Sequence, residues 1–383
     1  MAFVVLSFLL THRFEFIEIN NKIYFYFIIF IISLLPSYYN IITDIPEALP
    51  LSLHLLFFVM IFSIVGLHIS DYKQIRYFLI LFLTVSILNG LYVIFIALLT
   101  GNRVFGFSGI MYVDYVGYSI IISFLYLMIN KSRRLLILFA FSTFSLALIF
   151  TQTRSIWLVT GVTLLLIFIH LFIKNKRYNI SRLKISLAFV FVVATILVFT
   201  FIIRDVNKGY FERVEIKKME QTDDPMRQTL QINSLVTRYF IWSIAWDAFI
   251  SSPIIGVGIY GFPFISEKYS TLDPFLYETF VEELTPHETF LAILTESGIF
   301  GFIGFMLFLT TTIWYSIKNY RNSKSDQELF YSEIILWLTV YTFFSMIITD
   351  AWLWGHGIIL WGFLLGMSIA NRKMLNLNRM QIN

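Results

Sequence analysis

The chain has 383 residues, of which 58% are hydrophobic and only 14% are charged. Soluble globular domains are about 45–50% apolar and about 25% charged, so this composition excludes an ordinary soluble domain, a disordered chain, a coiled coil and a nucleic-acid-binding protein. The sequence has no cysteine, which excludes disulfides and thiol chemistry, and its formal net charge is only +4. An all-α, polytopic transmembrane helical bundle is the predicted fold class.

Long apolar stretches give the membrane-spanning elements in chain order. About 20 mostly apolar residues are needed for a helix to cross the roughly 30 Å hydrocarbon core of a bilayer. The opening segment, residues 1–10, is too short to span, and it lacks the basic region and cleavage site of a signal peptide. The predicted spans cover residues 23–41, 51–69, 76–99, 110–129, 134–150, 155–173, 185–203, 291–317, 329–349 and 351–370.

Basic linkers between the spans predict their orientation. Residues 131–134, 174–184 and 318–324 and the tail from Arg372 are short and rich in Lys and Arg, whereas each alternate linker is not. The positive-inside rule places such linkers in the cytoplasm, and the resulting alternation runs consistently through all the predicted spans. The C-terminus is therefore expected to be cytoplasmic.

One linker on the outer side is much longer than the others. It divides the chain into N-terminal transmembrane helices (residues 1–203), a large loop with short amphipathic helices (204–290), and C-terminal transmembrane helices with a tail (291–383). Loops of this length are usually functional. Transporters place their chemistry at mid-membrane, on broken helices with buried charges, whereas these spans are nearly free of charge inside. The sequence therefore favours an activity at the outer membrane face.

Two arginines are expected at the outer ends of spans. Arg154 follows Thr151-Gln152-Thr153, and Arg103 lies in an outer linker. An interfacial arginine often extends its side chain toward water, but its planar fork of donors also suits phosphate oxygens. Asp223 and Asp224 lie in a charged stretch without a nearby histidine, so no metal site is predicted there.

Residues 237–249 have the spacing of a helix that lies on the membrane surface. Ile241, Ala245 and Phe249 recur on one face, and Arg238, Trp242 and Trp246 recur on another. The helix is expected to end at Ser252-Pro253, and a flexible turn with Gly256, Gly258 and Gly261 should follow. The two tryptophans would anchor the helix at the interface or stack on a sugar, and Arg238 would bind a lipid-linked phosphate.

The segment Thr285-Pro286-His287-Glu288 predicts the start of a helix. Thr285 and Glu288 have the spacing of a capping box, and Pro286 would occupy the first helical position. His287 would then lie in the first turn, where the helix dipole keeps an imidazole neutral and therefore able to act as a general base. Surface exposure without a catalytic role is the alternative for His287.

Asp350, in the outer hairpin between the last two spans, would cap a helix or orient a histidine or arginine across the site.

Together these segments resemble the O-antigen ligase and polymerase family of bacterial envelope glycosyltransferases. The resemblance extends from about Arg103 to the C-terminus. It includes the Thr-Gln-Thr-Arg segment ending at Arg154, the large loop, Arg238 at the head of a Trp-rich helix, His287 followed by Gly298 and Gly301, and Asp350 near Trp354. The family histidine is usually followed by Asn, Ser or Gln, whereas Glu288 follows it here.

The resemblance implies a role for each matched residue. His287 matches the catalytic base, Arg154 and Arg238 match the arginines that hold the donor diphosphate, and Asp350 matches a functionally important acid. The family implies a C-type glycosyltransferase fold and catalysis without a metal ion or cofactor. The donor would be a glycan on undecaprenyl diphosphate, and direct displacement would invert the anomeric configuration.

The resemblance predicts an O-antigen ligase in the bacterial inner membrane, with its active site facing the periplasm and the lipid A core as acceptor. The alternatives are a repeat-unit polymerase that uses the same donor, transfer of the glycan to a protein or wall polymer, and a transporter of the lipid-linked glycan.

Overall fold

The protein is helical throughout the parts that the computed structural model describes. These are residues 22–100, 104–106, 111–129, 134–151, 153–190, 192, 234–282, 284–349 and 355–382, and they contain no strand. The chain forms two compact units, residues 1–75 with 234–383 and residues 76–233. The predicted all-α, polytopic fold class is confirmed.

Most predicted spans coincide with helices that the structure describes. The predicted span 185–203 is described only in part and is helical over residues 182–190. Among the described residues, six helices are long and apolar enough to cross a membrane, and residues 114–129 and 134–150 form shorter apolar helices. The six candidates are residues 25–44, 72–100, 154–173, 289–322, 326–348 and 357–377.

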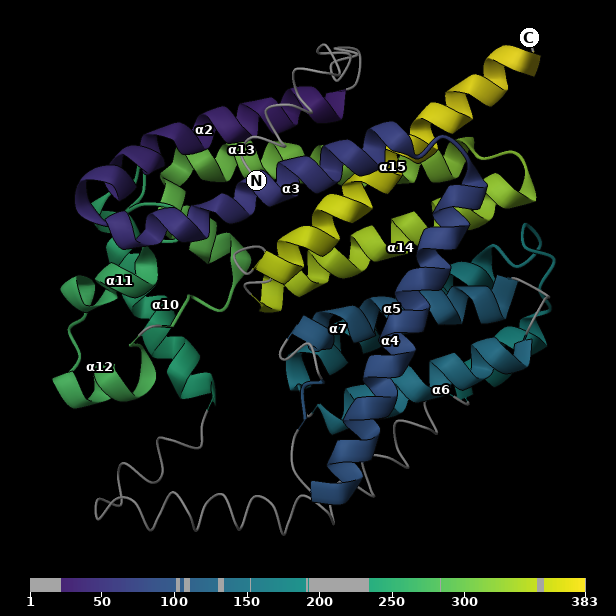
Figure 1. Cartoon of the computed structure of the whole chain (residues 1–383), viewed down its shortest axis with the longest axis horizontal. Helices are drawn as coiled ribbons and strands as arrows, with labels where there is room; N and C mark the ends of the chain where they lie inside the picture. The colour runs from purple at the N-terminus through teal and green to yellow at the C-terminus, as the bar shows by residue number, and fades with distance from the viewer. Residues whose placement is uncertain are drawn as a thin grey trace. The chain divides into compact units, whose positions relative to one another are not determined.

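The first unit contains the helices from both ends of the chain (Figure 1). Helix α13 packs against α2, α14 and α10, and α15 packs against α3 and α14. The unit comprises α2 (Lys22–Asp44), η1 (Pro46–Ala48), α3 (Leu49–His68), the start of α4 (Tyr72–Thr100), α10 (Ser234–Ser251), α11 (Phe262–Ile265), η2 (Ser266–Tyr269), α12 (Pro274–Phe280), α13 (Thr289–Asn322), α14 (Asp326–Ile348) and α15 (Gly355–Ile382).

Aromatic rings and glycines hold these long helices together. Phe27, Phe58 and Phe308 lie within ring contact of one another, and Trp361 stacks on Phe58. A Cβ at Gly362 would lie only 2.9 Å from the Phe58 ring, so glycine allows α15 to approach α3 closely. Small residues at such crossings give transmembrane helices their van der Waals contact.

Contacts at the two ends of the first unit match the predicted alternation of the spans. At one end, the Thr289 hydroxyl donates to the Thr349 carbonyl, which joins the start of α13 to the end of α14. At the other end, Tyr72 donates to Asn371 at 3.0 Å, which joins the start of α4 to α15. Helices α13 and α14 are therefore antiparallel, as the basic linkers predicted.

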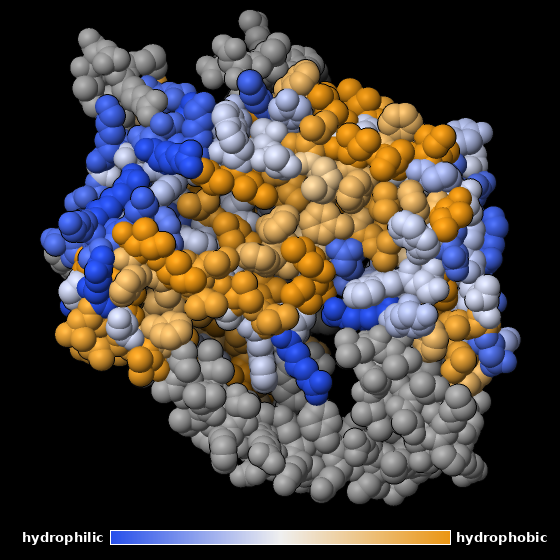
Figure 2. All heavy atoms as spheres, turned by 180° about the vertical axis from the view of Figure 1, so that it is seen from behind, coloured by the Kyte–Doolittle hydropathy of each residue, from blue (hydrophilic) through white to orange (hydrophobic). Residues whose placement is uncertain are grey.

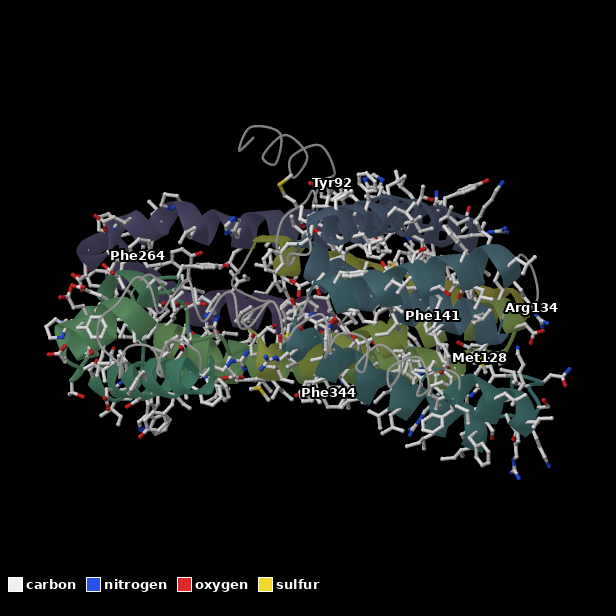
Figure 3. All side chains as sticks on the ribbon, turned by 90° about the horizontal axis from the view of Figure 1, so that it is seen from below. Tyr92, Met128, Arg134, Phe141, Phe264 and Phe344 are labelled. Atoms are coloured by element: carbon white, nitrogen blue, oxygen red, sulfur yellow. The ribbon has the colours of Figure 1, made fainter. Side chains whose placement is uncertain are left out.

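The second unit contains most of α4 together with α5 (Met111–Ile129), α6 (Arg134–Phe150) and α7 (Arg154–Ile173). Phe124 on α5 contacts both Phe141 on α6 and Phe168 on α7. Figure 3 labels Met128 near the end of α5, and the Lys184 ammonium donates to its carbonyl at 3.0 Å. This bond ties two of the predicted basic linkers to the same end of the unit.

The surface has large hydrophobic areas (Figure 2). Exposed side chains such as Leu35 on α2, Leu99 on α4, Leu135 on α6 and Leu158 on α7 are more than half accessible. Helices with this many exposed leucines find matching apolar surroundings only in the lipid bilayer. The chain is thus a multi-pass membrane protein.

Candidate functional site

Helix α10 is the first element of the candidate site. Its buried positions are Ile241, Ile244, Ala245 and Ala248, which recur at helical spacing and face the rest of the first unit. The predicted split into two faces is therefore correct for Ile241 and Ala245. The opposite face carries the polar and aromatic residues of the site.

The second face of α10 carries Arg238, Trp242 and Trp246, one helical turn apart. Arg238 is partly exposed, and 40% of Trp242 and 49% of Trp246 are accessible. Trp246 lies 5.3 Å from Phe249, centroid to centroid. Exposed rings on an amphipathic helix suit both predicted roles, an interfacial anchor and a platform for a sugar.

A hydrogen bond links α10 to the loop that carries His287. The indole N–H of Trp242 donates to the carbonyl of Pro286 at 2.9 Å. The Thr295 hydroxyl on α13 donates to the Ala245 carbonyl at 3.0 Å, on the buried side of α10. These two bonds fix the loop and the first turns of α13 beside α10, so the structure brings Trp242 together with the segment that contains His287.

The predicted capping box at Thr285 is wrong. Helix α13 begins at Thr289, and its N-cap is Glu288, whose carboxylate accepts from the backbone N–H groups of Phe290 and Leu291. His287 therefore precedes the N-cap rather than lying in the first turn. Its φ of 53° is in the left-handed region, so the helical conformation does not extend back to His287. Glu288 has the capping role of an N-cap residue, not of the third helical residue.

The position of His287 just outside the helix leaves its side chain partly exposed. The neighbouring Glu288 carboxylate is partly buried, and this burial raises its pKa although the two backbone N–H groups oppose the shift. The carboxylate beside His287 is therefore a stronger proton acceptor than an exposed glutamate.

The end of α14 meets the start of α13. Thr289, two residues after His287, donates its hydroxyl proton to the Thr349 carbonyl at 2.7 Å. Asp350 follows directly in the chain but lies outside the described residues, so its role stays a prediction. The bond brings the end of α14, one residue before Asp350, to the start of α13, two residues after His287.

The glycine-rich turn after α10 is packed, not flexible as predicted. Residues 256–262 are all buried. The N–H of Val257 donates to the Thr295 carbonyl at 3.0 Å, and the N–H of Ile299 donates to the Pro253 carbonyl at 2.9 Å. The turn thus docks on α13 at Gly298, where the helix is kinked (φ 65°, ψ −168°).

Two residues of this region were not predicted from the sequence. Glu296 on α13 is only 1% accessible, and its carboxylate accepts from the backbone N–H of Tyr260 at 2.9 Å. Tyr260 is buried with a φ of 58°. Burial, and secondarily the charge of Glu296, raise the pKa of the Tyr260 phenol, so it stays neutral. A glutamate inside an apolar span was the available sequence signal.

Arg154 belongs to the second unit. It is the first residue of α7 and is exposed, and the indole of Trp157 donates to the Leu148 carbonyl at 2.8 Å, which closes the turn from α6 into α7. A guanidinium and a helix N-terminus both attract anions. Its meeting with Arg238 and His287 stays a prediction.

Other predicted positions lie outside the described residues. These are Arg103 and the pair Asp223 and Asp224. Within the described ranges, no group of three His, Cys, Asp or Glu side chains could hold a metal ion.

The Trp242 bond gives a first testable expectation. Trp242→Phe keeps the ring but removes the donor to Pro286, and a lost hydrogen bond of this kind costs about 1 kcal/mol. We expect the rate of the predicted glycan transfer to fall by roughly fivefold. This follows from a loss of about 1 kcal/mol, because 1.4 kcal/mol corresponds to a factor of about ten.

The matched control is Trp314→Phe, because Trp314 is exposed on α13 and contacts Lys318 of the same helix. If Trp242→Phe transfers glycan at the same rate as this control, the bond from Trp242 to Pro286 does not hold the loop of His287 in place. A much larger loss in Trp242→Ala than in Trp242→Phe would support stacking of the ring on a sugar.

The fold and this assembly define a multi-pass helical membrane protein that gathers His287, Trp242 and Arg238 at one end of a unit. The model of the O-antigen ligase family matches residues 137–306, which include Arg154, Arg238 and His287. The chain is similar to the O-antigen ligase family over these residues, and the predicted resemblance is confirmed there. No curated protein matches the chain.

The matched family supports a ligase- or polymerase-type function in O-antigen processing, and it suggests a glycosyltransferase-type membrane enzyme that acts on lipid-linked glycans.

Proposed function

We propose that the protein is an O-antigen ligase, which transfers a glycan from undecaprenyl diphosphate to the lipid A core. The observation that carries this proposal is the bond between Trp242 and Pro286, which ties the histidine segment to the helix of Arg238 inside a family match. A candidate base and a candidate phosphate ligand are thereby attached to one rigid assembly.

The proposed reaction is a direct displacement at the anomeric carbon of the donor. The imidazole of His287 takes the proton from an acceptor hydroxyl as its oxygen bonds to that carbon. The bond from the anomeric carbon to the diphosphate oxygen breaks at the same time, with inversion of configuration. Undecaprenyl diphosphate leaves with the electron pair, and the protonated His287 later returns its proton to solvent.

The proposal assigns the leaving-group charge to the two arginines. Arg238 and Arg154 would hold the diphosphate oxygens, and fixed cations aimed at developing charge lower the barrier electrostatically. Asp350, Arg103 and the ring of Trp246 would support the site from its margins. No metal ion or cofactor enters the proposed step.

The proposed orientation follows from the basic residues. Lys318, Arg321 and Lys324 lie at the end of the first unit opposite to His287. The positive-inside rule would place them in the cytoplasm of a cell with an inner membrane, together with the C-terminus. The loop 204–290 and the candidate site would then face the periplasm, where the lipid-linked donor is displayed.

The test is transfer by the purified protein in lipid vesicles. The donor is a glycan on undecaprenyl diphosphate, and the acceptor is lipopolysaccharide that has only its core. We expect glycan-capped lipopolysaccharide, formed equally well with and without a metal chelator. Arg238→Ala should raise the donor concentration needed for half-maximal rate, because it removes a diphosphate ligand.

Each other outcome would replace the proposal. Longer glycan on the carrier without capping would identify a polymerase, and capping of a protein or wall polymer alone would change the acceptor. Passage of the donor across the vesicle membrane without transfer would identify a transporter.

A further inference from the structure

A buried carboxylate lies in the apolar core of the first unit. Glu296 is only 1% accessible, on a helix that crosses the membrane by length and composition. Its two carboxylate oxygens accept from the backbone N–H groups of Tyr260, at 2.9 Å, and Phe262, at 3.4 Å. Burying a charged carboxylate among apolar side chains costs free energy unless it is well hydrogen-bonded. The two bonds from Tyr260 and Phe262 offset this cost for Glu296.

The backbone of Glu296 is held to two further elements. Its carbonyl accepts from the N–H of Gly258 at 2.9 Å and from the hydroxyl of Ser37 on α2 at 2.8 Å. The amide of Asn40, also on α2, donates to the Gly256 carbonyl at 2.8 Å. Glu296 is thus the point where α2, α13 and the turn after α10 meet.

Steric constraints allow only glycine where the turn docks on α13. Gly256 and Gly298 both have positive φ, 73° and 65°, and a Cβ at Gly298 would lie only 2.6 Å from the Gly256 nitrogen. The kink of α13 and the turn after α10 therefore fit against each other backbone to backbone. This docking leaves the Tyr260 and Phe262 N–H groups directed at the Glu296 carboxylate.

The docked turn forms a closed circuit with the histidine segment. From Glu296, α13 leads back to His287, and the turn leads back through α10 to Trp242. Trp242 then closes the circuit by donating to the Pro286 carbonyl. Any loosening of the turn would move α10 relative to the start of α13.

We propose that Glu296 is a positioning residue that clamps the turn of residues 252–262 to α13 and thereby sets His287 against the Arg238 face of α10. Its catalytic consequence rests on the proposed transferase function, whereas the clamp itself does not. Glu296 touches neither donor nor acceptor in this role. It acts through the backbone of Tyr260 and Phe262.

The test combines backbone hydrogen exchange with transfer kinetics on the full chain in lipid nanodiscs. Glu296→Ala removes both acceptors, and we expect exchange in residues 256–262 and 287–290 to rise by at least about tenfold. Glu296→Gln keeps one carbonyl oxygen but turns an amide toward the other N–H, so a smaller rise is expected. This milder variant decides the question if Glu296→Ala does not fold.

The matched control is Glu333→Gln. Glu333 is also fully buried, but its carboxylate accepts from the indole of Trp337 on the same helix at 2.6 Å. The same chemical change there should leave exchange in residues 256–262 at its wild-type rate. The proposed clamping role of Glu296 is wrong if both Glu296 variants exchange like the wild type in residues 256–262. It is also wrong if exchange rises equally along the whole chain.

The kinetic readout separates positioning from simple stability. A positioning role predicts that Glu296→Gln lowers kcat per folded molecule while the KM for the donor stays unchanged. Faster exchange with wild-type kcat would overturn the link to His287 and leave the transferase intact. If the wild type transfers no glycan to any acceptor, the proposed function fails, and the exchange data still decide the clamp.

Discussion

Replacement of His287 by asparagine is expected to lower transfer by about 10²- to 10⁴-fold, the contribution typical of a positioned general base. Asparagine is the informative choice because His287 has a φ of 53°, a conformation that asparagine adopts more readily than most residues. The backbone of the loop should therefore stay in place while the imidazole is lost. The measurement is the rate of capping in vesicles at saturating donor.

A second variant and a control make this expectation specific. His287→Ala adds backbone strain to the loss of the base, so it should be at least as inactive as His287→Asn. His68→Asn changes an exposed histidine in the last turn of α3 and should transfer at the wild-type rate. Near-wild-type capping by His287→Asn would show that another group takes the proton.

The composition predicted the fold well because lipid restricts the backbone so strongly. Every buried N–H and C=O must be paired within a spanning segment, so an apolar stretch of sufficient length has few alternatives to a helix. The basic linkers added the alternation, which the bonds from Thr289 to Thr349 and from Tyr72 to Asn371 reproduce at opposite ends of the first unit.

The start of α13 shows where local sequence signals are ambiguous. Thr285 and Glu288 have capping-box spacing, but Glu288 can also cap a helix that starts one residue after it, and the structure has this second arrangement. In this arrangement the Pro286 carbonyl accepts from the indole of Trp242, a bond between residues far apart in the sequence. The Glu288 carboxylate caps the helix in the way that the shorter side chains of Asn and Ser commonly do.

The packed turn after α10 was missed for a related reason. Glycines followed by no regular pattern usually mark a flexible loop, and nothing in the local sequence shows that Gly256 lies against Gly298. Only Glu296, a buried glutamate near the start of the apolar helix α13, signals that a polar partner must exist nearby. Its partners are backbone N–H groups, which no sequence pattern identifies.

The second large effect is expected for Gly298→Ala. The residue has a φ of 65° and a ψ of −168°, a backbone region that is essentially restricted to glycine and costs other residues about 1–3 kcal/mol. A Cβ there would also overlap the carbonyl of Ile254 and lie 2.6 Å from the Gly256 nitrogen. Both neighbours are backbone atoms held by hydrogen bonds, so the turn cannot give way without separating from α13. We expect a total loss of at least about 3 kcal/mol, in the range of severe backbone substitutions.

The matched control for this change is Gly161→Ala on α7, where a Cβ would meet no atom within 4 Å. Alanine is a better helix former than glycine by roughly 0.5–1 kcal/mol, so this control should be as stable as the wild type or slightly more stable. Thermal unfolding in detergent, followed by size-exclusion chromatography, measures both variants. A Gly298→Ala protein as stable as the control would mean that the turn does not dock on α13 as the structure has it.

The loss of structure in Gly298→Ala should be local at first, because the aromatic contacts between α2, α3 and α13 lie elsewhere in the unit. Exchange in residues 252–262 should therefore rise before the unit unfolds, in the same segment that Glu296 holds.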